Sequence, residues 1–170
     1  MLEAIAQRAS VRSYKPDPVS DEDIQIILEA ALHAPSANNA RPWHIVVVRD
    51  EVRRQQLSGV HQWASFCTQS PVVLVFCAEE SRSPHWWIED LSAAVENALI
   101  QASALGLGTC WIGIRGGGPG HPISREEKVR QICDIPHGIR VLAVVSLGHP
   151  AGSPHAKQPG PMGNVHGETW

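Results

Sequence analysis

The sequence has no long hydrophobic run and no strong excess of one charge. No stretch approaches the ~20 apolar residues of a membrane-spanning helix, and the first residues, MLEAIAQRAS, lack the long apolar core of a secretion signal. The formal net charge is −3, so the overall balance does not point to nucleic acid or to an anionic membrane. We therefore expect a cytoplasmic protein that binds neither nucleic acid nor membrane.

The compact motifs of several enzyme classes are also missing. The nine histidines and four cysteines never form HExxH or a close Cys/His set, so no metal site is expected. The GxSxG motif of serine hydrolases is absent, as are the GxGxxG and GxxxxGK[ST] phosphate loops. We assign no side chain as an obligate catalytic acid, base or nucleophile.

The cysteines are few and widely spaced, with no CxxC pair. Cys77 and Cys110 lie within strand-like runs, and Cys67 and Cys133 stand apart from them. Buried free thiols are therefore the preferred interpretation over disulfides.

The 170 residues, 43% of them hydrophobic, suit one domain with a real core. Residues 71–78 are apolar on both faces, which indicates a central strand in a covered sheet. Periodicity predicts helices over 2–9, 21–33, 51–63, 88–105 and 124–133, and strands over 44–50, 71–78, 109–114 and 139–148. Helices outweigh strands and alternate with them irregularly, which favours helices packed around one sheet. From residue 150 to 167 no periodicity remains, which indicates an extended arm.

A cluster of cations lies near the amino end, in RASVRSYK at residues 8–15. Arg8, Arg12 and Lys15 lie beside the hydroxyl of Ser10. Because the guanidinium fork matches phosphate oxygens two at a time, a phosphate site is one interpretation. The other is a solvated basic surface beside a helix end, and the charges alone favour this second interpretation.

The loop APSANNARPWH, residues 34–44, separates a predicted helix from a predicted strand. Pro35 and Ser36 end the helix, whereas Asn38 and Asn39 tolerate a left-handed backbone and offer amide groups. Such a loop suits a flat heterocycle, which it would meet with backbone N–H and C=O groups. It equally suits a capped turn that only steers the chain into the strand.

Two further stretches carry weaker signals. In GLGTCWIGIRGGGPG, residues 106–120, glycines allow a ligand close to the backbone, but residues 116–120 are better explained as a mobile loop than as a phosphate cradle. In HWWIEDL, Glu89 and Asp90 are adjacent and face different sides of a helix. An acidic first helical turn is therefore a plainer account than an acid–base pair.

Together these stretches resemble the nitroreductase family of FMN-dependent oxidoreductases, in its short form. The family patterns are R-x-S-x-R-x-[FY], A-P-S-x-x-N-x-Q-P-W, D-x-x-x-A-x-x-N-x-L leading to G-L-G-T-x-W-I-G, and a closing V-H-x-E-x-W. They match Arg8, Ser10, Arg12 and Tyr14; Ala34, Pro35, Ser36, Asn39, Pro42 and Trp43; Asp90, Ala94, Asn97, Leu99 and residues 106–113; and Val165, His166, Glu168 and Trp170. The likeness runs from end to end in the right order, which makes it far more specific than any one motif.

The resemblance implies an α+β sandwich, with a central, mostly antiparallel sheet flanked by helices, that forms an intertwined homodimer. Residues 1–170 would be one FMN-binding domain, with 150–170 as an arm around the neighbouring copy and an FMN at each subunit interface. The cofactor-binding residues carried over are Arg8, Ser10, Arg12 and Lys157 at the phosphate, Pro35, Ser36, Ala37 and Asn39 from the partner's loop, and the backbone of Ile112 and Gly113 near flavin N5 and O4.

The implied activity is a ping-pong reaction. NADH or NADPH passes hydride to flavin N5, and an electron-poor acceptor, such as a nitroaromatic, a quinone or an enone, then takes it. Arg41, Trp87 and Arg115 are the candidate substrate-pocket residues, although core packing is an equal interpretation for one of the Trp86–Trp87 pair. Two alternatives stay open: a flavin enzyme that acts with oxygen or halogenated aromatics, and a flavin-binding carrier or redox sensor without turnover.

The chain departs from the family pattern at two places. Arg41 replaces the glutamine of the loop, which would change what faces the pocket mouth. The tail pattern K-x-R becomes Lys157, Gln158 and Pro159, so one cation is lost and weaker FMN retention is expected than in typical members. The glycine-rich stretch 116–120 is also unusual, and we interpret it as a lid over the substrate face.

Overall fold

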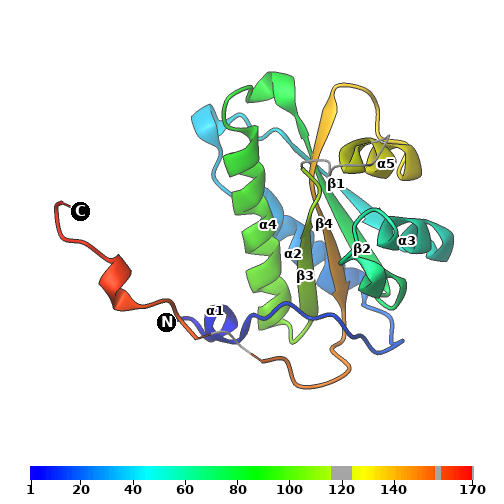
Figure 1. Ribbon diagram of the computed structural model, residues 1–170, viewed down its shortest axis with the longest axis horizontal. Helices are drawn as coiled ribbons and strands as arrows, with labels where there is room; N and C mark the ends of the chain where they lie inside the picture. The colour runs from blue at the N-terminus through cyan, green and yellow to red at the C-terminus, as the bar shows by residue number, and fades with distance from the viewer. Residues whose placement is uncertain (116–123, 156–157, 170) are drawn as a thin grey trace.

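A four-stranded antiparallel sheet lies at the centre of the structure, a computed structural model that describes residues 1–115, 124–155 and 158–169 (Figure 1). The strand order is β1-β2-β4-β3, which leaves β1 and β3 at the edges. The strands are β1 Trp43–Val48, β2 Val72–Glu79, β3 Gly108–Gly113 and β4 Ile139–Gly148; the α-helices are α1 Glu3–Gln7, α2 Asp21–Leu32, α3 Glu51–Ser58, α4 Trp87–Ala104 and α5 Arg125–Ile132. Short 3-10 turns cover Ala37–Asn39, Ser65–Thr68, Glu80–Arg82 and Met162–Asn164.

Helices cover both faces of this sheet, because its central strands are apolar on both sides. In β2, Leu74 and Phe76 pack into a core with α2 and α4, whereas Val73 and Val75 pack into a second core with α3 and α5 (Figure 1). Successive side chains of a strand point to opposite faces, so one uninterrupted apolar run supplies both cores. The predicted central strand and the predicted α+β sandwich are confirmed.

Local sequence signals set most helix ends. The hydroxyl of Ser20 accepts a hydrogen bond from the N–H of Asp23 at 3.0 Å, and α4 ends just before Gly106, whose φ is +73°. Both are local sequence signals: Ser followed three residues later by Asp favours a helix start, and a glycine just past the last turn favours a helix end. The predicted helix over 51–63 was wrong at its far end: α3 stops at Ser58, and a separate 3-10 turn follows. Only Leu57 of α3 is buried, so packing gives little reason to extend the helix past Gly59.

The four cysteines are free thiols, as predicted. Cys67, Cys77 and Cys110 are buried, and Cys133 is half-buried. Burial raises the pKa of Cys67 and of Cys77 to about 12, so these thiols stay protonated at neutral pH.

The cation-rich segment near the amino end crosses the start of β3. Ser10 forms a parallel bridge with Thr109, and the N–H of Val11 donates to the carbonyl of Thr109 at 2.8 Å. The hydroxyl of Tyr14 donates to the carbonyl of Val11 at 2.7 Å and lies 2.5 Å from the hydroxyl of Ser146. These contacts fix residues 8–15 against the sheet, and with them the cations that the sequence analysis singled out.

Gly108 allows this close crossing, and replacing it with alanine is expected to destabilise the fold. A Cβ atom at Gly108 would lie 2.7–2.8 Å from three side-chain atoms of Val11. Such overpacking costs about 1–3 kcal/mol in the free energy of unfolding, measurable by urea denaturation. Val11→Ala removes two of these three atoms, so the loss in the double variant should be smaller than the sum of the losses in the two single variants. A Gly108→Ala variant as stable as the wild type would contradict the crossing.

The carboxyl-terminal arm extends away from the sheet and helices (Figure 1). Its described residues beyond Ala151 are exposed, among them Met162 at 79% and Val165 at 68% of their surface. No helix in the described part of the chain is both long and apolar enough to cross a membrane.

Candidate functional site

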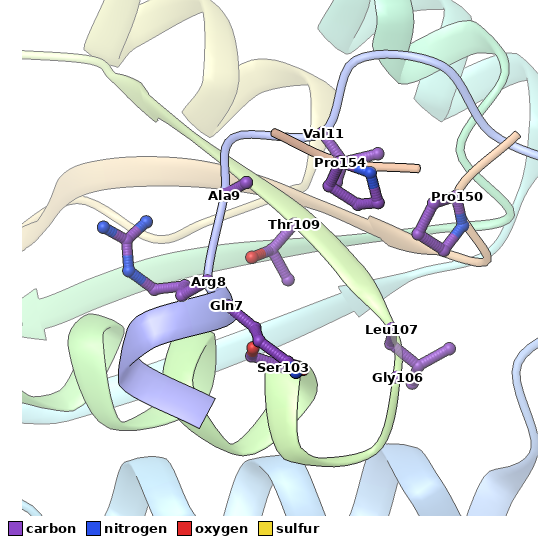
Figure 2. Close-up of a pocket in the computed structure, with 10 residues that line it drawn as sticks. All are labelled: Gln7, Arg8, Ala9, Val11, Ser103, Gly106, Leu107, Thr109, Pro150 and Pro154. Carbon is purple, nitrogen blue, oxygen red and sulfur yellow. The ribbon is translucent and has the colours of Figure 1, made fainter. Parts of the chain in front are cut away.

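A cavity of about 340 Å³ lies where the amino-terminal segment, the end of α4 and the start of the arm meet (Figure 2). Arg8 lines it from the amino-terminal side, Ser103 and Thr109 from α4 and β3, and Pro150 and Pro154 from the arm. The structure thus brings together two segments that lie about as far apart in the sequence as possible. A cation at such a junction suits an anionic group.

The two arginines of the segment have different neighbours. The Nε of Arg8 lies 3.2 Å from a carboxylate oxygen of Glu96 on α4. Arg12 donates from Nη1 to the carbonyl of Ser10 at 3.3 Å. Burial raises the pKa of the Cys110 thiol in the α3–α5 core, while the nearby Arg12 charge and a hydrogen bond with Ser10 act in the opposite direction. Arg8 lines the cavity, whereas Ser10 and Arg12 are not part of its lining.

The outer edge of β3 continues from this cavity. Thr109 directs its carbonyl outward to Val11, whereas the next residue past the strand, Ile114, donates inward to Leu142 of β4 at 3.0 Å. Because alternate residues of a strand face opposite edges, the backbone groups of Trp111 and Gly113 face outward with Thr109. No other described segment pairs with β3 there. This stretch, Thr109 to Gly113, is called the β3 edge below and is about 13 Å long at the usual rise per residue.

Gly113, at the far end of the β3 edge, fits a group that does not belong to this chain. It is exposed, and a Cβ atom built there would meet nothing within 4 Å among the described residues. Glycine weakens a strand because it loses more backbone freedom on folding than other residues. Since no described contact needs its small size, a ligand lying against the backbone would explain it. Ile112 differs: it is 5% exposed in the α3–α5 core, and its backbone faces β4.

The loop over residues 34–41 has an unusual backbone. Asn38, Asn39 and Arg41 have φ values of +51°, +54° and +46°. The left-handed backbone expected at the two asparagines is confirmed, whereas Arg41 has no such intrinsic preference. Strain of this kind persists only where surrounding contacts fix it, and it is frequent at ligand sites.

Hydrogen bonds inside the chain fix this loop. The N–H of Asn39 donates to the carbonyl of Ser36 at 3.0 Å, and the N–H of Arg41 donates to the Ser36 hydroxyl at 2.9 Å. The Arg41 side chain folds back and donates from Nε to the Asn39 side-chain oxygen at 2.8 Å. The N–H of Ala37 donates to Asp90 at 2.7 Å. The N–H groups of Ala37, Asn39 and Arg41 are thus already used, and a ligand would contact other groups of the loop, including the exposed side chain of Pro35.

Asp90 is the residue whose role the sequence analysis missed. It lies in the first turn of α4, as an acidic helix start predicts, but it is only 4% exposed. One carboxylate oxygen accepts from the N–H of Ala37, and the other accepts from the buried hydroxyl of Ser83 at 2.7 Å. The plain account of an acidic first turn holds only for its exposed neighbour Glu89. The signal available in the sequence was the family pattern that begins with this aspartate.

The three candidate pocket residues have different surroundings. Trp87 is 3% exposed and belongs to the core. The guanidinium of Arg115 lies over its ring, 5.6 Å from the ring centre. Any contribution of Trp87 to a pocket is therefore as a floor beneath Arg115, whereas Arg41 lies on the exposed loop.

Some predicted features lie outside the described residues. They are Lys157 and the glycine-rich stretch 116–120. Within the described ranges, no group of three or more histidine, cysteine, aspartate or glutamate side chains is arranged to hold a metal ion.

Comparison with known proteins places this arrangement in one family. The model of the nitroreductase family matches residues 5–64 and 60–149. A protein of Methanothermobacter thermautotrophicus, described as an NADH dehydrogenase/NAD(P)H nitroreductase, is 35% identical over 173 residues, which cover 100% of this chain and 87% of that protein. The FMN reductase [NAD(P)H] of Bacillus subtilis is 27% identical over 191 residues, with 100% of this chain and 74% of that protein covered.

Solved structures indicate the same family. An FMN-dependent nitroreductase from Clostridium difficile superposes with a TM-score of 0.94 at 30% identity, covering 100% of both chains. A nitroreductase-type protein from Desulfovibrio desulfuricans, solved in complex with FMN, superposes with a TM-score of 0.81 at 26% identity, covering 99% of this chain and 96% of that one. The fold of this chain combines a cavity lined by Arg8, a strand edge that ends at Gly113, and a loop with left-handed asparagines. By these comparisons, this chain belongs to the nitroreductase family.

Proposed function

We propose that this protein is an FMN-dependent oxidoreductase that oxidises NADH or NADPH and reduces an electron-poor acceptor, such as a nitroaromatic, a quinone or an enone, by a ping-pong mechanism. The observation that carries the proposal is the β3 edge, with the segment that carries Arg8 and Arg12 beside Thr109 at one end and Gly113 at the other. FMN has matching ends, a dianionic phosphate and a flat ring joined by a ribityl chain. When bound, FMN supplies the hydride-transfer chemistry.

The residues of this chain would hold the cofactor and leave one ring face open. Arg8 and Arg12 would neutralise the phosphate, with Ser10 and Lys157 as further phosphate contacts. The outward backbone groups at Gly113 would lie against the ring near N5 and O4, where oriented dipoles stabilise a developing charge. None of these roles requires a side chain that gains or loses a proton, which agrees with the absence of an assigned acid or base.

We also propose that the site is completed by a second copy of the chain, as an intertwined homodimer. The exposed arm, with the apolar side chains of Met162 and Val165, would be stabilised by packing on a neighbour, since the described core of the chain does not cover it. Residues 1–170 then act as one domain, with 150–170 as the arm, and Pro35, Ser36, Ala37 and Asn39 face the partner's flavin. Free thiols also favour a cytoplasmic location.

The test is stopped-flow spectroscopy of the FMN-loaded protein. Mixing with NADH or NADPH should bleach the flavin absorbance, and a nitroaromatic or quinone added afterwards should restore it. An inert flavin would indicate a carrier or sensor instead, and reoxidation by oxygen or halogenated aromatics alone would indicate the other flavin chemistry. Light scattering on a sizing column should give a dimer, and a monomer that retains FMN would overturn the shared site.

Glu96 is expected to weaken FMN binding, because its carboxylate competes with the phosphate for Arg8. The side chains of Arg8 and Glu96 are 29% and 46% exposed, so solvent screens the ion pair. The effect of Glu96 on FMN affinity is therefore modest. Glu96→Gln keeps an oxygen that can accept from Arg8 and removes the charge. FMN affinity, measured by quenching of flavin fluorescence, should rise about 2- to 5-fold.

A matched control separates this effect from a general change in charge. Glu127 forms an ion pair with Arg130 at 3.0 Å on α5, across the sheet from α4. Glu127→Gln should leave FMN affinity unchanged. Weaker binding in Glu96→Gln would mean that Glu96 acts mainly to orient Arg8.

A further inference from the structure

Arg115 and Arg140 both lie against the ring of Trp87, but among the described residues only Arg140 has carboxylate partners. Their guanidinium carbons lie 5.6 Å and 4.9 Å from the ring centre, respectively. Trp87 is buried at the start of α4, so its ring is a rigid support for both groups. Such stacking holds a guanidinium flat and leaves the N–H groups at its rim available.

The donors of Arg140 are used within the chain. Nε and Nη2 donate to the two carboxylate oxygens of Glu126 at 2.8 Å and 3.2 Å, and Nη1 donates to Glu80 at 2.9 Å. These contacts raise the pKa of Arg140 further above its ordinary value, and the charge is fully compensated. Arg140 is therefore a structural cation that joins β4 to α5 and to the 3-10 turn after β2.

The N–H groups of Arg115 have no such partner in the part of the chain that the structure describes. In the described ranges, stacking on the ring of Trp87 is its one side-chain interaction, with no hydrogen bond to it and no carboxylate within ion-pair distance. The residues that follow it, GGGPGHPI at 116–123, contain no acidic side chain, so they supply no counter-ion either. An exposed guanidinium on a fixed support, with its N–H groups unused, is suited to a carboxylate or phosphate ligand.

Arg115 lies at the ring end of the proposed site. It is two residues beyond Gly113, and the inward hydrogen bond of Ile114 continues the β3–β4 pairing past the strand. Side chains two residues apart point to the same face of a strand, so Arg115 leaves the sheet on the face of Gly113, toward α4. A ligand that lies over the ring next to Gly113 would have this guanidinium at its rim.

We propose that Arg115 determines specificity by binding an anionic group, a carboxylate or a phosphate, on the molecule that faces the flavin. This inference rests on the proposed function, which it deepens by naming the substrate class. The anion has two sources, a carboxylate on the electron acceptor or the pyrophosphate of the nicotinamide coenzyme. Both use the same bidentate contact, so the experiment compares charged and uncharged partners in each half-reaction.

The test compares Arg115→Gln with the wild type in both half-reactions of the FMN-loaded protein. Acceptor kcat/KM is measured with 4-nitrobenzoate and with nitrobenzene, and flavin bleaching is measured with NADH and with 1-benzyl-1,4-dihydronicotinamide, which carries no phosphate. A charge-assisted contact predicts a loss of about tenfold for the charged partner and less than about twofold for the uncharged one. Loss with nitrobenzoate identifies the acceptor as the anion, and loss with NADH identifies the coenzyme.

Two variants act as controls. Arg115→Lys keeps the charge but not the bidentate fork, so it should retain only part of the selectivity, whereas Arg82→Gln removes an exposed arginine from the turn after β2 and should change nothing. Equal losses for charged and uncharged partners in Arg115→Gln, or no loss in either half-reaction, would overturn the proposal.

A binding measurement keeps this inference separate from the proposed function. Benzoate is titrated against tryptophan fluorescence, because Trp87 lies directly beneath Arg115. Arg115→Gln should weaken benzoate binding about tenfold, and an unchanged affinity would count against the anion site. If the wild-type flavin is reduced by neither nicotinamide, the proposed function fails, and the benzoate titration still decides the role of Arg115.

Discussion

Replacing Arg8 with alanine is expected to weaken FMN binding by about 10- to 100-fold. Hydrogen bonds to a charged group contribute about 1.5–3 kcal/mol, and 1.4 kcal/mol corresponds to a factor of ten in affinity. Arg8 is the cation that lines the cavity at the start of the β3 edge, so its loss removes the nearest positive charge from the proposed phosphate position. Titration of the flavin-free protein with FMN, followed by flavin fluorescence, measures the change.

Salt dependence gives the same prediction an independent readout. The wild-type affinity for FMN should fall as ionic strength rises, because a dianionic phosphate is partly held by exposed cations. In Arg8→Ala this dependence should be weaker. Riboflavin has the same ring without the phosphate, so its affinity should be nearly the same in the two proteins.

Arg49 provides the matched control. It forms an ion pair with Asp21 next to the end of β1, at the opposite edge of the sheet. Arg49→Ala removes one arginine and one exposed ion pair, as Arg8→Ala does, but should leave FMN affinity unchanged. If Arg8→Ala kept the wild-type affinity while Arg12→Ala lost it, the phosphate would be held by Arg12 and not in the cavity that Arg8 lines.

Strong and local patterns in the sequence predicted most of the fold. The last strand was expected over 139–148 and spans Ile139–Gly148, because its apolar run is long and lies between clear turn signals. The helix caps at Ser20 and Ser124 depend on contacts three residues away, so they were also readable. The end of α3 could not be read from the sequence, since a polar helix with one buried residue carries no periodic signal.

The candidate site was predictable only where its chemistry is local. Charge alone favoured a solvated surface for residues 8–15; the family resemblance and the cavity around Arg8 support a phosphate site instead. The outward orientation of Gly113 depends on which strand lies beside β3, and that pairing joins residues 30 positions apart. Glu96 and Asp90 contact residues 88 and 53 positions away, so no local pattern identifies their partners.

Replacing Asp90 with alanine is expected to lower the free energy of unfolding by about 3 kcal/mol. Both carboxylate oxygens accept hydrogen bonds, from the N–H of Ala37 and from the hydroxyl of Ser83, which is 4% exposed. Each donor left without a partner costs about 1–3 kcal/mol. Urea denaturation followed by circular dichroism measures the loss, and Asp90→Asn should lose less because its oxygen still accepts one hydrogen bond.

The neighbouring carboxylate tests whether burial or helix position causes this effect. Glu89 shares the first turn of α4 but is exposed. Exposed substitutions of this kind change stability by about 0.5 kcal/mol or less, so Glu89→Ala should resemble the wild type. Equal losses in the two variants would assign the effect to the charge at the helix start rather than to the anchored loop.

The same aspartate also tests the shared site, because it anchors the loop that would face the partner's flavin. In the proposed homodimer, each FMN contacts the arginines of one subunit and the Ala37 loop of the other. A mixed dimer with Arg8→Ala in one subunit and Asp90→Ala in the other therefore has both defects at one site and leaves the second site intact. It should bind one FMN at about wild-type affinity.

The reverse pairing gives the opposite result. A dimer of one wild-type subunit and one subunit with both substitutions has a defect at each site, so neither should bind FMN at wild-type affinity. Such dimers can be isolated by giving the two subunits different affinity tags. If instead the wild-type subunit of this second dimer retained one tight FMN, the arginines and the loop of a single chain would form the site, and the intertwined arrangement would be wrong.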